Sequence, residues 1–333
     1  HPDIAERNEE FAQATTLALF DYLRKSKSRG FALSLSGGAD SSCCAVLVAE
    51  MIRRGSTQLG WSNFSEQLNI SAKNEKEATQ HLLTCAYQGT RNSSATTLEA
   101  AKILAESIGA TFHHWQVDDE VESYKSKIET VLNRPLSWEN DDIALQNIQA
   151  RSRSPIIWML ANIKQAILLT TSNRSEGGVG YTTMDGDTSG SLAPIAGVDK
   201  PFIIQWLKWA EKDLGYKGLA LVNGLKPTAE LRPADSDQTD EKDLMPYHLL
   251  VRIEKLAIRD RKSPREVYST LITEFDKDLL KTSIVKFFRL WSINQWKRER
   301  IAPSFHLDDM NIDPRSWCRF PILSGGFHAE LAG

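Results

Sequence analysis

The sequence predicts an α/β fold with a doubly wound (Rossmann-like), mostly parallel sheet, because three features of the chain agree. Segments patterned as strands alternate with segments patterned as helices between residues 9 and 171. The stretch 166–171, AILLTT, is apolar on both faces, as strands buried between two helical layers are. The third feature is a Gly37-Gly38 turn between a strand candidate at 31–36 and a helix. We therefore expect a ligand at the carboxyl ends of the strands.

Hydrophobic periodicity places the other elements in chain order. A helix is expected over 9–25, with one side formed by Phe11, Leu17, Phe20 and Leu23. The segment 54–80 is polar and contains Gly, Asn and Ser, which predicts a surface insertion. The remaining expected elements are a helix from Asp40 to about Arg53, strands at 82–87 and 110–117, and helices at 94–108, 119–133 and 142–164.

The overall composition is that of a soluble globular protein, with 41% apolar and 25% charged residues among 333. The net charge of −3 gives no general attraction to nucleic acid, so we expect no such partner. The basic run 286–300 also contains Phe and Trp, and we interpret it as a solvated or interface face. The chain shows no signal peptide and no apolar run of about 18 residues, which predicts a cytoplasmic protein without a membrane span. Its four cysteines form no CxxC pair, which fits a reduced compartment without a zinc site.

The segment 31–42, FALSLSGGADSS, has the pattern of an anion-binding loop. A strand, a glycine turn and a helix start place backbone N–H groups and the positive end of a helix dipole around one point. Two glycines let the backbone approach an anion closely, and Ser36, Ser41 and Ser42 add hydroxyl donors. Asp40 adds a carboxylate at the same point, which indicates a divalent cation between it and the anion. No Gly-Lys-Ser/Thr follows, so this is not a Walker A loop.

The string 36–42 resembles the SGGxDS pyrophosphate loop (PP-loop) of the ATP pyrophosphatase superfamily, whose enzymes cleave ATP to AMP and pyrophosphate. Further motifs in the same order and spacing resemble the NAD synthetase family. They are NIQARSR (147–153), TTSNRSEGGVGYTTMDGDTSG (170–190), LAPIAGVDK (192–200), KPTAELRP (226–233), and NQWKRERIAPSFHLDD with WCRFPILSGGF near the C-terminal end. Many compact members have Gly-Thr-Asp-His where this chain has Thr-Thr-Ser-Asn at 170–173. That change, the stretch 87–94 and the C-terminal run are similar to the larger, glutamine-dependent members.

The resemblance implies a fold of the adenine nucleotide alpha-hydrolase type, with a synthetase domain over 1–260 and a helical C-terminal extension over 261–333 packed on it. It also implies a reaction in two steps. The nicotinic acid carboxylate of deamido-NAD attacks ATP and releases pyrophosphate, and ammonia then displaces AMP to leave NAD. In the larger members, a nitrilase-like glutaminase domain supplies the ammonia. No segment before the loop is long enough for that domain, so we expect this chain to be the synthetase part, with the glutaminase in cis in the full-length protein.

For ATP and Mg²⁺, the resemblance carries over residue by residue. Asp40 and Glu176 match magnesium carboxylates, and Lys200 matches a lysine that binds phosphate. The residues expected around ATP are Ser36, Gly37, Gly38, Ser41, Ser42, Thr171, Lys200 and Thr228. A helix N-terminus stabilises an exposed anionic group by only about 0.3–1 kcal/mol, so a polyphosphate also needs the metal and the lysine. The acidic segment 230–243 has the composition of a plain surface loop, and the resemblance implies a lid that orders over ATP. The two are compatible, because a lid must be polar when it is open.

For deamido-NAD, the resemblance points to four residues, which are Asn147, Arg151, Trp158 and Asp187. Arg151 is a candidate clamp for a phosphate or carboxylate, and Trp158 stands where other members carry a tyrosine that stacks on the ring. Asp187 is a candidate for orienting either the pyridine ring or the ammonia, and both roles stay open. In the family, the long helix expected at 142–164 pairs with its mate in a homodimer, so the pocket is shared between subunits.

Other functions compete with this interpretation. One is a stand-alone, ammonia-dependent NAD synthetase. Another is a different enzyme of the superfamily, such as an amidotransferase that makes GMP or asparagine, or an enzyme that thiolates tRNA. A thiolating enzyme needs a reactive cysteine near the nucleotide, and Cys85 has no partner in the sequence. A sensor that binds nucleotide without turnover is the third alternative, and the presence of both Asp40 and Glu176 argues against it.

Overall fold

The structure is a computed structural model that describes residues 3–225, 240–316 and 318–332. Its elements are α1 (Ile4–Ser26), β1 (Phe31–Ser34), α2 (Ala39–Leu59), α3 (Trp61–Leu68), α4 (Glu75–Leu82), β2 (Leu83–Gly89), α5 (Ala95–Ile108), β3 (Thr111–Gln116), α6 (Asp118–Leu132), α7 (Trp138–Lys164), β4 (Ile167–Leu169), α8 (Arg174–Gly177), α9 (Lys200–Lys212), η1 (Lys217–Leu219), α10 (Ala220–Gly224), α11 (Asp240–Asp243), α12 (Tyr247–Glu254), η2 (Lys255–Arg259), α13 (Pro264–Leu271), α14 (Lys277–Ile293), α15 (Gln295–Arg298) and α16 (His328–Leu331). No helix among these residues is long and apolar enough to cross a membrane.

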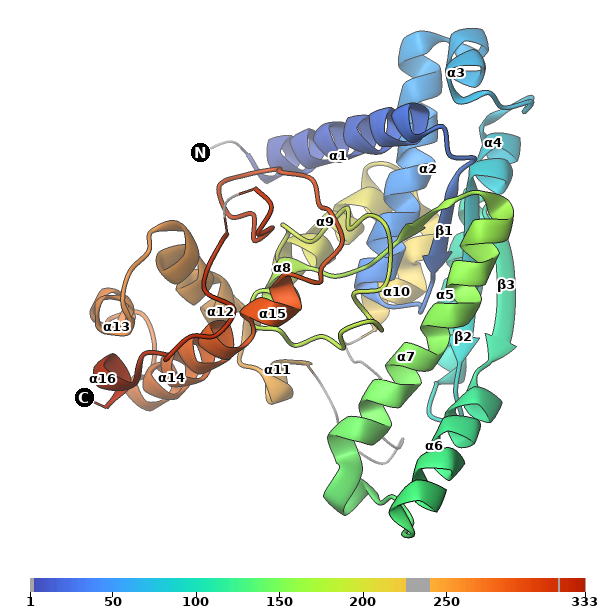
Figure 1. Cartoon of the computed structure of the whole chain (residues 1–333). Coiled ribbons are helices and arrows are strands. Elements are labelled where there is room, and N and C mark those ends of the chain that lie inside the picture. Colours follow the sequence, from blue (N-terminus) through green and yellow to red (C-terminus); the bar gives the residue numbers. More distant parts are fainter. Residues whose placement is uncertain (1–2, 226–239, 317, 333) are drawn as a thin grey trace.

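A parallel sheet with the strand order β3-β2-β1-β4 lies at the centre of the N-terminal part. Phe31 of β1 pairs with Leu83 of β2 on one side and with Ile167 of β4 on the other. The long helix α7 covers one face of the sheet, and α1, α2, α5 and α9 lie on the other (Figure 1). The predicted doubly wound α/β fold is therefore confirmed.

Strand side chains alternate between two cores. Phe31 and Leu33 of β1 point into the larger core with α1, α2, α5 and α9, whereas Ala32 points into the smaller core under α7. In β4, Leu168 points toward α7 and its two neighbours point the other way. This is the period of two expected for a strand, with both faces buried. It explains why the stretch AILLTT is apolar throughout.

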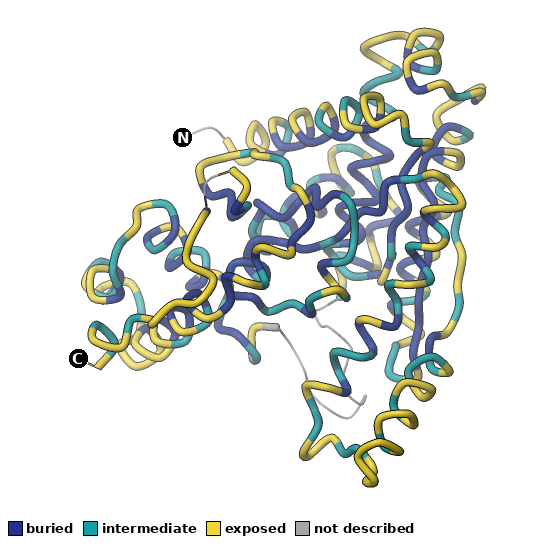
Figure 2. Tube along the Cα trace, viewed as in Figure 1, coloured by how far each residue is buried: buried dark blue, intermediate teal, exposed yellow. Residues whose placement is uncertain are grey.

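The C-terminal helices build a separate core. Buried residues of α12, α13 and α14 pack together there, among them Leu250, Val267 and Phe287. Val179 and Ala193, which precede the expected domain boundary at residue 260, belong to the same core. Figure 2 shows buried segments in both parts of the molecule. The helical part is thus built onto segments of the first part.

Three local expectations differ from the structure. The helix expected from Asp40 to about Arg53 continues to Leu59, and the segment predicted as a surface insertion also carries the helices α3 and α4. A Cβ on Gly55 would lie 2.6 Å from the ring of Phe64, so this glycine lets α3 pack closely instead of ending α2. Leu17 is 67% exposed, because Thr15 and Leu19 take the inward positions of α1. The long helix begins at Trp138, with a kink at Asp141, rather than at residue 142.

Candidate active site

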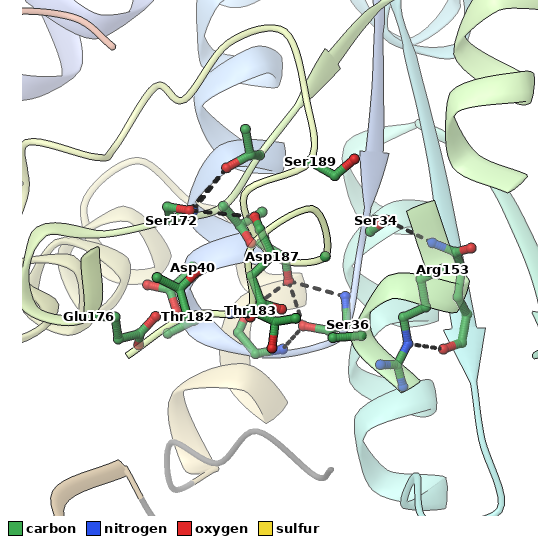
Figure 3. Close-up of a pocket in the computed structure, with 18 of the residues that line it drawn as sticks. Ser34, Ser36, Asp40, Arg153, Ser172, Glu176, Thr182, Thr183, Asp187 and Ser189 are labelled. Carbon is green, nitrogen blue, oxygen red and sulfur yellow. Dashed lines mark hydrogen bonds between the residues drawn. The ribbon is translucent and has the colours of Figure 1, made fainter. Parts of the chain in front are cut away.

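A cavity of about 750 Å³ lies at the carboxyl edge of the sheet, as the sequence predicted for a ligand. Its lining includes Ser36 after β1, Gln88 at the end of β2 and Thr170 after β4. Strand order reverses between β1 and β4, and this reversal point is where open α/β sheets bind ligands. Figure 3 shows Asp40 and Glu176 on one side of the cavity, Ser34 and Arg153 on the other, and Asp187 between them.

The loop between β1 and α2 has the geometry of an anion site. Gly38 is the N-cap of α2, so the first N–H groups of a 21-residue helix point toward the cavity edge. Gly37 has a φ of +80°, and a Cβ there would lie 2.1 Å from the carbonyl oxygen of Thr97, so only glycine fits. The Ser36 hydroxyl accepts from Gly38 N at 3.3 Å and lies 3.1 Å from the Ser41 hydroxyl. These groups hold the loop in shape before any ligand binds.

Lys200 joins the two predicted metal carboxylates. Its Nζ donates to Asp40 Oδ2 and, at 3.0 Å, to Glu176 Oε1. Lys200 is buried, while the side chains of Asp40 and Glu176 keep 16% and 20% of their exposure. All three side chains line the cavity. The structure therefore brings together groups that are up to 160 residues apart in the chain.

Helix caps explain this arrangement. The Asn173 side chain caps α8 by accepting from Glu176 N at 3.0 Å, and its Nδ2 donates to Asp40 Oδ1 at 3.1 Å. Asp199 caps α9 by accepting from Phe202 N, so Lys200 is the first residue of that helix. Asn173 was not among the predicted site residues. The sequence feature that could have identified Asn173 is its position as a helix-capping residue just before the run Arg-Ser-Glu.

The residues of this site fit Mg²⁺ that arrives with a polyphosphate. No group of three or more His, Cys, Asp or Glu suited to a metal occurs among residues 3–225, 240–316 and 318–332. Asp40 and Glu176 thus supply two carboxylates, and Mg²⁺ commonly binds through one or two carboxylates plus substrate phosphates and water. The positive charge of Lys200 lies against both carboxylates.

Asp187 lies at the centre of the cavity lining. Its carboxylate is open to the cavity and accepts from Thr183 N at 2.6 Å. Its depth within the protein raises the pKa of Asp187, and the nearby charges of Arg153 and Lys297 oppose that rise. Burial lowers the pKa of Lys297. A carboxylate with a raised pKa accepts a proton more readily than an ordinary aspartate does.

The other predicted residues divide into those that line the cavity and those that do not. Asn147 and Thr171 line it, and Asn147 Oδ1 accepts from the Thr183 hydroxyl at 2.9 Å. Arg151 is exposed, and its Nε donates to Met184 O at 2.9 Å. Trp158 is half-buried, and its Nε1 donates to the Ser189 hydroxyl at 2.8 Å. The lining includes neither of these two side chains.

Two predicted ATP residues are also outside the lining, namely Gly37 and Ser42. The Ser42 hydroxyl is buried, with no hydrogen-bond partner in the part of the chain that the structure describes. Thr228 and most of the segment 230–243 lie outside the described residues.

Sequence reasoning missed several lining residues that carry polar groups. Arg153 of α7 lines the cavity, and its Nε donates to Gln88 O at 2.9 Å. Lys297 enters from α15 and donates to Gly180 O and Thr182 O, each at 2.9 Å. Its neighbour Arg298 is 1% exposed and donates to Gly178 O. The interpretation of 286–300 as a solvated or interface face is therefore wrong for these two side chains.

The family model described as NAD synthase matches residues 11–300 of the chain. Glutamine-dependent NAD(+) synthetases of Oryza sativa subsp. indica and Arabidopsis thaliana are each 32% identical to it. These matches take in 90% of this chain but only 45% and 46% of the two plant proteins. A solved glutamine-dependent NAD(+) synthetase from Cytophaga hutchinsonii is 57% identical, with a TM-score of 0.89, over 98% of this chain and 55% of that one. The chain thus spans about half the length of these relatives.

An NH3-dependent NAD synthetase from Campylobacter jejuni has a similar fold, with a TM-score of 0.54 and 19% identity. That match covers 86% of this chain and 96% of the Campylobacter chain. At this identity, the likeness concerns the fold alone.

Proposed function

Because the chain belongs to the NAD synthase family, we propose that it catalyses the ATP-dependent conversion of deamido-NAD to NAD. In the first step, the nicotinic acid carboxylate attacks the α-phosphorus of ATP, which forms an acyl-adenylate and releases pyrophosphate. In the second, ammonia attacks the acyl carbon, AMP leaves, and a proton is released. A carboxylate is a poor acyl donor, and AMP provides the leaving group that it lacks.

The observation that carries this proposal is the meeting of three groups at one edge of the cavity. Asp40, Glu176 and Lys200 lie beside the N-terminus of α2, where backbone N–H groups attract an anion. Bound Mg²⁺ would neutralise part of the negative charge on the β- and γ-phosphates as pyrophosphate departs. Lys200 would bind a phosphate oxygen, and the Ser36 and Ser41 hydroxyls would donate to others.

The middle of the cavity supports the second step. Asp187 faces the cavity between the ATP edge and Arg153 (Figure 3). Its raised pKa suits it to accept a proton from ammonium or from the attacking ammonia. A carboxylate at this place would equally orient the pyridine ring through a hydrogen bond. The two roles differ in which step they affect.

The chemistry of the cysteines disfavours a thiolating enzyme. Cys85, Cys43 and Cys44 are all buried, and burial raises the pKa of each thiol. A thiol with a raised pKa is a poor nucleophile at neutral pH. Ligation of nitrogen is therefore the favoured reaction, although GMP or asparagine synthesis would use the same adenylation step.

The relatives are longer than this chain, which bears on the source of the ammonia. These proteins are about twice as long as the matched segment and are named glutamine-dependent. We propose that a glutaminase domain in cis supplies ammonia in the full-length protein, and that this chain alone uses free ammonia. A stand-alone, ammonia-dependent enzyme is the alternative. We also propose a homodimer through α7 and a cytoplasmic location.

The test is NAD formation from deamido-NAD, ATP and Mg²⁺, run in parallel with ammonium and with glutamine. NAD formed with ammonium alone is the expected result. NAD formed from glutamine by this chain would contradict the need for a separate glutaminase. Release of pyrophosphate without NAD in either reaction would show that the adenylate has another acceptor and would refute the proposed substrate.

A further inference from the structure

Arg174 is a buried cation that lies two residues before Glu176 and belongs to none of the groups discussed above. It is 3% exposed, although it is the first residue of the four-residue helix α8. Its guanidinium donates to three acceptors, which are Gly197 O at 2.6 Å, Asp199 Oδ2 at 2.8 Å and Glu254 Oε2 at 3.3 Å. A buried arginine with several fixed partners holds its neighbours in a defined geometry.

The partners of Arg174 lie on the elements that carry the ATP edge. Asp199 uses one carboxylate oxygen to cap α9 and the other to accept from Arg174. Lys200 follows Asp199 directly, and its backbone N donates to the Ser175 hydroxyl at 3.2 Å. The start of α9 is therefore tied to α8 at two successive residues. These contacts fix the position of Lys200 relative to Glu176.

Glu254 ties the same point to the helical core. It ends α12, is completely buried, and contacts Arg174 through one oxygen. Its other oxygen, Oε1, has no hydrogen-bond partner among the described residues. Burial raises the pKa of Glu254 to about 7. In Figure 1, α8 lies between α9 and α12, and α12 contacts both of them.

We propose that Arg174 is a positioning residue for the ATP edge, acting through a buried clamp with Asp199 and Glu254 that sets Glu176 against Lys200. The proposal rests on the proposed function, because it assigns the clamp to the step that releases pyrophosphate. A short helix such as α8 has too few internal hydrogen bonds to fix its own side chains. Residues that orient metal carboxylates from behind usually change metal affinity or activity by about 10- to 100-fold when they are replaced.

Two substitutions distinguish the effect of the clamp from the effect of the cap at the start of α9. Arg174→Lys keeps the charge but removes the planar fork that reaches three acceptors. Asp199→Asn keeps a side-chain oxygen that caps α9, since Asn and Asp cap helices about equally, but replaces the oxygen facing Arg174 with a donor. Arg252→Lys is the matched control, because Arg252 makes an exposed ion pair with Glu274 on the helical side.

The experiment measures Mn²⁺ binding by electron paramagnetic resonance in the presence of α,β-methylene ATP, which is not hydrolysed at the bond in question. We expect both clamp variants to weaken Mn²⁺ binding by about 10-fold or more, and the control to leave it unchanged. The rate of pyrophosphate release should fall in parallel, while the KM for deamido-NAD stays within about twofold. Circular dichroism and thermal unfolding identify variants that are not folded. If Arg174→Lys does not fold, the result for Asp199→Asn alone tests the proposal.

Folded clamp variants with wild-type Mn²⁺ affinity and wild-type pyrophosphate release would overturn the proposal, even with a lowered melting temperature. That result would mean that the clamp only stabilises the fold. Loss of Mn²⁺ affinity in the clamp variants would support the clamp even if the wild-type chain makes no NAD. In that case the proposed function fails and the clamp does not.

Discussion

The two sides of the cavity differ in how their residues are held. On the ATP side, Lys200 contacts both Asp40 and Glu176. The helix-capping residues Asn173 and Asp199 hold the segments that carry these groups. On the side expected for deamido-NAD, Asn147 and Asp187 line the cavity. The side chains of Arg151 and Trp158 are not part of that lining. The described residues of one chain thus hold the charged groups of the expected ATP side together. The dinucleotide side is not completed by the residues that the sequence suggested.

The contrast is consistent with the chemistry on each side. A polyphosphate requires a dense set of charges in fixed positions, and charged residues held at helix N-termini can supply it. A dinucleotide is long and needs contacts spread along a surface, which a second subunit can share. Substitutions on the two sides should therefore differ in the substrate whose use they impair.

The largest effect is expected from removing either carboxylate on the ATP side. Asp40→Ala or Glu176→Ala should slow pyrophosphate release by about 10³-fold or more, because each removes a group that stabilises the leaving pyrophosphate. The measurement is the rate of pyrophosphate release at saturating ATP, with Glu106→Ala on the exposed face of α5 as the control. Near-normal rates in both variants would refute the assignment of these carboxylates.

The next effect concerns the pH dependence of stability. The pKa of Glu254 is raised from its ordinary 4.5 to about 7 by burial, so the native state takes up a proton between these values while the unfolded chain does not. The stabilisation is fully present below pH 4.5 and is lost as the pH rises through 7. It amounts to about 3 kcal/mol.

The measurement is the free energy of urea unfolding for wild type and Glu254→Gln between pH 5 and 8. The glutamine does not titrate, so the wild type should lose stability relative to the variant as the pH rises. Parallel curves for the two proteins would contradict a raised pKa for Glu254 in this pH range.

A smaller effect should separate the two reaction steps at Asp187. Asp187→Asn keeps the size of the side chain but removes the proton acceptor. If Asp187 acts on ammonia, pyrophosphate release continues and NAD formation slows by about 10²-fold. If it orients the pyridine ring, both rates fall together with a raised KM for deamido-NAD. Pre-steady-state measurement of both products distinguishes these roles, and unchanged values for both would exclude them.

The smallest effect compares two arginines of α7. Arg153→Lys should raise the KM for deamido-NAD by about 10-fold, since Arg153 lines the cavity and a lysine cannot reproduce its fork. Arg151→Lys should change the KM by less than about twofold if one chain forms the whole site. An equal effect from Arg151 would mean that the substrate reaches the exposed face of α7, as in a pocket shared between subunits.

Much of the fold could be predicted from local pattern. Strand and helix order, the parallel sheet and the position of the cavity follow from periodicity and from the Gly37-Gly38 turn, which are properties of neighbouring residues. The helical nature of 54–80 could not be predicted this way. Gly55 is accommodated there because Phe64 packs against it, and that contact comes from another helix.

The sequence by itself determined the anion loop and the identity of the charged groups, because a strand, two glycines and a helix start lie within twelve residues of one another. Only the tertiary structure decided which charged groups meet. Lys200 reaches Asp40 across 160 residues, Lys297 enters from a helix beyond the expected domain boundary, and Arg174 links α8 to two distant carboxylates. The physical reason is that burial and ion pairing depend on separation in space. Local sequence patterns report only on separation along the chain.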